Sequence, residues 1–234
     1  MITRALVLVL ALARVAHADP ARDRAALGEF EAAYRAIAAL SGAARTDQAC
    51  VDAAKLNAAG TAFSSEIAPA DAPVDNETWA SAAGSLVVAL HELTQVCKAP
   101  DRKLRLLGPD FKTADQVVAE LDKAVQQVMN SARPRTLPPG LKAARAPIAA
   151  MRSSSKSICT QQPKLMKALA QVKKPPAGVA AAAWNERVLT VKNIADDLRP
   201  GACGKHRAAD EQIGSALNEL HDHFYELVLL VPPR

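Results

Sequence analysis

Aromatic residues and glycines are scarce in this chain. Its 234 residues include four phenylalanines, two tyrosines, two tryptophans and ten glycines. The glycines are scattered, so they form no phosphate-binding loop. A nucleophile elbow, a metalloprotease helix and a paired-carboxylate motif are all missing. We therefore expect a non-catalytic protein without a cofactor or a metal site.

The sequence also lacks an apolar run long enough to cross a membrane. The apolar stretch 5–13 has nine residues, whereas a spanning helix needs about 20. A basic start precedes this stretch, and the triplet Ala16-His17-Ala18 follows it, as in a secretory signal peptide. We expect residues 1–18 to be removed, which leaves a periplasmic or secreted chain that begins at Asp19.

Alternation typical of strands is absent, and apolar residues recur instead with a helical period. The expected helices cover about 19–42, 46–65, 75–97 and 113–129, then one ending near 157, one over 162–174, and two around 184–198 and 213–227. Modest loops between them favour antiparallel neighbours. The sequence therefore predicts an all-α fold of antiparallel helical bundles.

The cysteines and tryptophans occur twice in the same order. Cys50, Trp79 and Cys97 in the first half match Cys159, Trp184 and Cys203 in the second. The successive spacings are 29 and 18 residues in the first half, and 25 and 19 in the second. We interpret this pattern as an internal duplication of about four helices each, with repeats at 19–136 and 137–234. Whether the repeats form one bundle or two stays open.

Four cysteines in an exported chain indicate two disulfides, for which three pairings exist. The antiparallel order places the start of the second helix beside the end of the third. That order predicts a Cys50–Cys97 bridge and, in the second repeat, a Cys159–Cys203 bridge. Each closed loop is worth roughly 4 kcal/mol in the chain-entropy model.

Charge is segregated along the chain. Residues 19–136 have a net charge of −3 and residues 137–234 a net charge of +6, and the acidic hairpin 56–97 contains no Lys or Arg. From 123 to 185 there are eleven Lys or Arg and no carboxylate. The candidate polyanion-binding residues are Lys142, Arg145, Arg152 and Lys156 on the fifth helix, and Lys164, Lys167 and Lys174 on the sixth.

On an ideal helix, the four residues of the fifth helix fall within about 80° of one another. Such stripes attract polyanions, but they are also typical of solvated faces, and they could dock against the acidic hairpin 56–97. No aromatic residue lies between 123 and 183, which disfavours nucleic acid as the partner.

The loop 98–112 is about ten residues longer than its counterpart in the second repeat. It contains the candidate partner residues Arg102, Lys103, Arg105, Leu106 and Leu107. Leucines among arginines could contact a partner or a membrane, or could fold down as a lid over one end of a bundle. We favour the lid.

The sequence thus favours an exported, non-catalytic interaction module for an anionic envelope component or a partner protein. The alternative is a carrier of a small apolar ligand, which a large apolar cavity near Trp79 or Trp184 would support. A cofactor-binding bundle using His91 is a more distant third. The sequence specifies neither the partner nor the oligomeric state.

Overall fold

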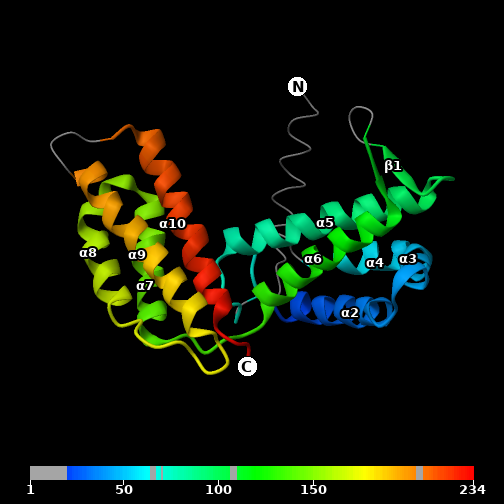
Figure 1. Cartoon of the computed structure of the whole chain (residues 1–234), viewed down its shortest axis with the longest axis horizontal. Helices are drawn as coiled ribbons and strands as arrows, with labels where there is room; N and C mark the ends of the chain where they lie inside the picture. Colours follow the sequence, from blue (N-terminus) through cyan, green and yellow to red (C-terminus); the bar gives the residue numbers. More distant parts are fainter. Residues whose placement is uncertain (1–19, 64–66, 70, 106–109, 204–207) are drawn as a thin grey trace. The chain divides into compact units, whose positions relative to one another are not determined.

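The computed structural model describes residues 20–63, 67–69, 71–105, 110–203 and 208–234 (Figure 1). Within them the chain forms nine α-helices, one short 3₁₀ helix and one two-stranded hairpin. The predicted helical class is confirmed, although the hairpin was not predicted. The chain divides into two compact units after Ala132, and each is described separately below.

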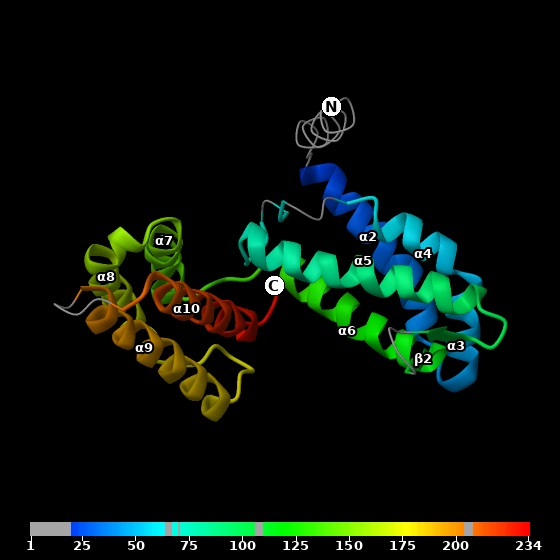
Figure 2. The same cartoon turned by 90° about the horizontal axis from the view of Figure 1, so that it is seen from above.

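The described part of the first unit contains five helices and the hairpin. Its elements are α2 (Pro20–Ala38), α3 (Gly42–Val51), α4 (Ala53–Gly60), α5 (Asn76–Lys98), β1 (Lys103–Arg105), β2 (Phe111–Thr113) and α6 (Ala114–Ala132). The long helices α5 and α6 pack along each other (Figure 2). Helix α4 packs on α5 and α2, and α3 packs on α6, α2 and α5.

The long helices begin and bury their faces as the sequence predicts. The side chain of Asp75 caps α5 by accepting a hydrogen bond from the Thr78 amide at 3.0 Å. Thr113 and Gln116 form the predicted capping box at the start of α6. The buried residues along the two helices are Trp79, Ala83, Leu86, Leu90 and Leu93 on α5, and Val117, Leu121, Val125 and Val128 on α6.

Two local expectations in the first unit are wrong. The expected helix 46–65 is broken at Asp52 into α3 and α4, so Cys50 lies near the end of α3 rather than in a first turn. The expected loop 98–112 contains the antiparallel hairpin, in which Leu104 faces Lys112 across the pair of strands.

The second unit is a ring of four helices. Its elements are α7 (Pro139–Ser153), the 3₁₀ helix η1 (Ser155–Ser157), α8 (Ile158–Leu169), α9 (Ala181–Cys203) and α10 (Asp210–Leu230). Helix α7 packs on α8 and α10, and α9 packs on the same two helices. Their apolar stripes meet around the fully buried Trp184. At Gly140, a Cβ atom would lie 2.7 Å from the carbonyl oxygen of Ala168, so α7 approaches α8 closely there.

The two ends of the second unit are fastened together. The backbone amide of Arg234 donates to the carbonyl of Pro134 at 2.9 Å, and Arg135 pairs with Pro233 in an isolated β-bridge. The buried guanidinium of Arg135 donates to the carbonyl oxygen of Val231. Burial lowers the pKa of this guanidinium. The segment before α7 and the end of α10 therefore form one clasp.

One disulfide braces each unit. Cys50 is bonded to Cys97 in the first unit and Cys159 to Cys203 in the second, the same pairs that the antiparallel order predicts. Among the described helices, none has the length and apolarity that crossing a membrane requires.

Candidate functional site

The seven candidate polyanion-binding residues all lie on the α7–α8 half of the second unit, and we call them the basic surface. Lys142, Arg145 and Arg152 are on α7, Lys156 is in η1, Lys164 and Lys167 are on α8, and Lys174 is in the connection after α8. The expected helices were too long here, because α7 ends at Ser153 and α8 ends at Leu169. Lys156 and Lys174 therefore do not belong to the helical stripes to which the sequence assigned them.

Packing turns these cations outward. Helix α7 buries Leu141, Ala144, Ile148 and Met151 against its neighbours, which leaves its basic residues on the sides away from the core. The five lysines are exposed and the two arginines are half-buried. The surface thus presents five exposed ammonium groups and two partly buried guanidinium groups.

Six residues of the basic surface, all except Arg152, form no ion pair with a described residue of the second unit. Arg152 donates to the side-chain oxygen of Asn218 at 3.1 Å. No carboxylate occurs in α7, η1, α8 or the connection that follows. Such a surface attracts anions in a salt-dependent way.

The α9–α10 half of the same unit has the opposite character. Its carboxylates are Glu186, Asp196, Asp197, Asp210, Glu211, Glu219, Asp222 and Glu226. Here a cation is paired: Arg187 lies 2.5 Å from Glu226, and both contact Nδ1 of His223 at 2.9 Å. Glu226, three residues after His223 on α10, is thus the acidic neighbour of this histidine.

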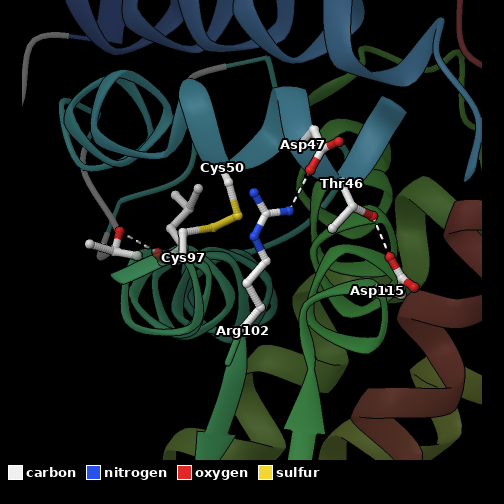
Figure 3. The surroundings of a disulfide bond; sticks show 8 residues. Thr46, Asp47, Cys50, Cys97, Arg102 and Asp115 are labelled. Atoms are coloured by element: carbon white, nitrogen blue, oxygen red, sulfur yellow. Dashed lines mark hydrogen bonds and ion pairs between the residues drawn. A yellow bond between two sulfur atoms is a disulfide. The ribbon is translucent and has the colours of Figure 1, made fainter. Parts of the chain in front are cut away.

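Some residues of the candidate partner loop make contacts within the first unit. Arg102 adopts a left-handed backbone (φ 51°), and its guanidinium pairs with Asp47 on α3 (Figure 3). Lys103 places its ammonium 4.4 Å from the ring centre of Phe111, and Arg105 is exposed. Leu106 and Leu107 lie outside the described residues. The strands contact α5 and α6, so the structure gives Arg102 an internal role.

The hairpin borders two grooves that the sequence did not reveal. One, of 310 Å³, lies between α3, the hairpin and the start of α6 and is lined by Asp47, Arg102 and Asp115 among others. The other, of 340 Å³, lies between α5 and α6. There Lys112 bonds to Glu120 at 2.7 Å and Glu92 at 3.0 Å, and these bonds raise the pKa of its ammonium group. Neither groove is lined by Trp79 or Trp184.

A polar cluster joins three helices of the first unit. Arg45 on α3 donates to Asp122 on α6 at 2.6 Å and to the hydroxyl of Tyr34 on α2 at 3.1 Å. The Tyr34 hydroxyl in turn donates to Asp122. Burial and this bond raise the pKa of Tyr34. The three residues are far apart in sequence and carry no motif, so no sequence pattern could have predicted the cluster.

His91 is exposed on α5, and the described residues contain no group of three or more side chains that could hold a metal ion. Among the described residues, the charged surfaces and the disulfides are therefore the features with distinctive chemistry. Comparison with models of known protein families, with curated protein sequences and with solved structures finds no match for this chain.

Proposed function

We propose that this protein is an exported, non-catalytic binding module whose second unit contacts an anionic envelope component or an acidic partner protein. In this proposal, residues 1–18 are a signal peptide, and the mature chain consists of two antiparallel bundles that arose by internal duplication. The observation that carries the proposal is the basic surface, in which six of the seven cations, all except Arg152, form no ion pair with a described residue of their unit.

Like charges on one face repel each other, so the fold itself does not benefit from them. An anionic partner removes that repulsion, and it gains an attraction that acts over about 8–10 Å at physiological ionic strength. The lysine-rich composition favours phosphate, carboxylate or sulfate groups on a flexible polymer or a headgroup layer. Lysine meets such groups as a point charge and does not impose the two-pronged geometry of arginine.

The test is retention of the full mature chain on heparin and on vesicles that contain phosphatidylglycerol. We expect retention at low salt and loss of retention as salt rises. The double reversal Lys164→Glu with Lys167→Glu should abolish it. These two exposed lysines are chosen rather than Arg145 and Arg152 because Arg152 is bonded to Asn218 within the unit.

The matched control is Lys55→Glu with Lys98→Glu in the first unit. Both lysines are exposed helix residues there, and their reversal changes the net charge by the same amount. If retention depends on the basic surface, the control keeps most of it. Equal losses in both variants would mean that net charge alone is responsible, and the proposal would fail.

Docking of the basic surface on the acidic hairpin 56–97 predicts a different outcome. In that case, reversal of Lys164 and Lys167 lowers thermal stability and leaves heparin elution unchanged. The carrier alternative receives no support from the two grooves, since neither reaches the tryptophans. Native mass spectrometry that finds a co-purified apolar molecule would favour the carrier instead.

A further inference from the structure

The two disulfides differ in their access to solvent. Cys159 and Cys203 are both exposed, whereas Cys50 and Cys97 are half-buried. The ion pair between Arg102 and Asp47 lies in the surroundings of the first bridge (Figure 3). Because thiol–disulfide exchange needs direct approach to a sulfur atom, the second bridge is the more open to attack.

The bridges also differ in the helix ends that they join. Cys50 is the next-to-last residue of α3, and Cys97 is the next-to-last residue of α5. Both sulfurs of the first bridge thus lie at carboxyl ends, where the helix dipole disfavours a thiolate. In the second bridge, Cys159 is the second residue of α8, while Cys203 is the last residue of α9. The amino end of α8 favours a thiolate on Cys159.

The charges near the second bridge act in the same direction. Lys156 lies three residues before Cys159 in η1, and α7, η1 and α8 contain no carboxylate. Helix α9 carries Asp196, Asp197 and Arg199 in the two turns before Cys203, which together have a net charge of −1. Residues 204–207, which follow Cys203, lie outside the described part of the chain. From the described residues, a thiolate on Cys159 is the better leaving group.

We propose that the Cys159–Cys203 bridge is a thiol–disulfide exchange site, and that its substrate is a dithiol, either a small molecule or a pair of cysteines on a redox protein. A thiolate of the dithiol attacks Sγ of Cys203 and forms a mixed disulfide. The bond between Cys203 and Cys159 breaks, and Cys159 leaves as a thiolate.

The second thiol of the substrate then attacks the mixed disulfide, which releases Cys203. The substrate is oxidised to a disulfide, and the two electrons and two protons end on Cys159 and Cys203 as thiols. The reaction disconnects the start of α8 from the end of α9 and leaves the first bridge intact. This inference is independent of the polyanion proposal.

The first experiment uses the full mature chain under native conditions. Dithiothreitol is added, samples are quenched with N-ethylmaleimide, and the four cysteines are followed by peptide mapping. We expect the Cys159–Cys203 bridge to open about tenfold faster or more, because it combines access with a good leaving group. Equal rates, or faster opening of Cys50–Cys97, would overturn the proposal. In guanidinium chloride the two rates should converge, since the difference arises from the fold.

The second experiment determines which sulfur is attacked. The native chain is treated briefly with glutathione, and excess N-ethylmaleimide is then added to stop the reaction and block each released thiol. Glutathione should be found on Cys203 and the maleimide on Cys159. Glutathione on Cys159 would overturn the assigned direction of attack.

A pair of single variants provides the matched control. In C203S the remaining Cys159 thiol should react with iodoacetamide at lower pH than the Cys203 thiol does in C159S. Lys156→Gln in the C203S background should move the Cys159 profile toward higher pH. Identical profiles for the two thiols would contradict the role of the amino end of α8.

Discussion

The first unit and the basic surface of the second unit differ in how their cations are used. In the first unit, ion pairs involve Arg24, Arg35, Arg45, Arg102 and Lys112. Five of the six pairs that these cations form, counting both carboxylates on Lys112, join residues more than four positions apart, and the Arg45–Asp122 pair joins α3 to α6. In the second unit, the residues of the basic surface other than Arg152 make no ion pair with a described residue of that unit.

This contrast separates two uses of charge. A partly buried pair such as Arg45–Asp122 orients neighbouring helices, and its loss leaves a polar group without a partner. Exposed lysines contribute only tenths of a kcal/mol each to stability, so the stability of the fold does little to determine where they lie. The Arg45–Asp122 pair of the first unit therefore has a structural role. The exposed lysines of the basic surface in the second unit are available to a partner.

The largest expected effect comes from replacing one of the two buried tryptophans, of which each unit contains one. Trp184→Ala removes the largest buried side chain of the second unit and should cost that unit about 3–5 kcal/mol. The remaining Trp79 then reports on the first unit alone. We expect the Trp79 fluorescence transition in urea to keep its midpoint, while circular dichroism shows an earlier loss of helix.

The reciprocal variant Trp79→Ala is the control, with Trp184 as the reporter of an unchanged second unit. A shift of the Trp79 midpoint in Trp184→Ala would mean that the units unfold as one cooperative body. The comparison between them would then lose its basis.

An intermediate effect is expected from the polar cluster. Asp122→Ala leaves Arg45 and Tyr34 without their shared acceptor, and we expect a loss of about 1–3 kcal/mol in the free energy of unfolding. Lys164→Gln on the basic surface should change it by no more than about 0.5 kcal/mol. Chemical denaturation measures both. Similar losses for the two variants would show that charge has the same role in both units.

The smallest effect is a pH dependence that arises from Tyr34. Its pKa is raised in the folded chain, first by burial and then by its bond to Asp122. The unfolded tyrosine ionises near pH 10, so the stabilisation is present below about pH 10 and falls as the pH rises beyond it. The stability difference between the wild type and Tyr34→Phe should therefore decrease between about pH 9 and 11. Lys112, whose pKa is also raised, is present in both proteins, so its effect cancels. A difference that does not change with pH would contradict this role.

Periodicity and chain order were sufficient to predict much of the fold. The stripes through Trp79 and Trp184 are buried, and the cysteines pair as the order of helices implies. These features follow from the 3.6-residue repeat and from neighbouring helices that run in opposite directions, both of which are readable in one sequence.

Other features depend on information that a single sequence does not carry. The buried stripe Thr46, Ala49, Ala53, Leu56 continues across the break at Asp52, so its period predicts one helix where there are two. The strands have three residues each, too few to show alternation. The composition of the sequence was enough to find the residues of the basic surface. Placing them on the fold required the ends of α7 and α8, and the expected helices extended beyond both ends.

The clasp between Arg135 and the last residues of the chain holds the two ends of the second unit next to each other, so these ends can be joined in more than one way. Since its first and last residues lie side by side, a short linker from Arg234 back to Arg133 would close the unit without strain. New ends could then be opened in the segment between α8 and α9. Domains with adjacent termini tolerate circular permutation and insertion into loops of other proteins. We therefore expect the second unit to accept circular permutation, or insertion into another protein, without a change in its core.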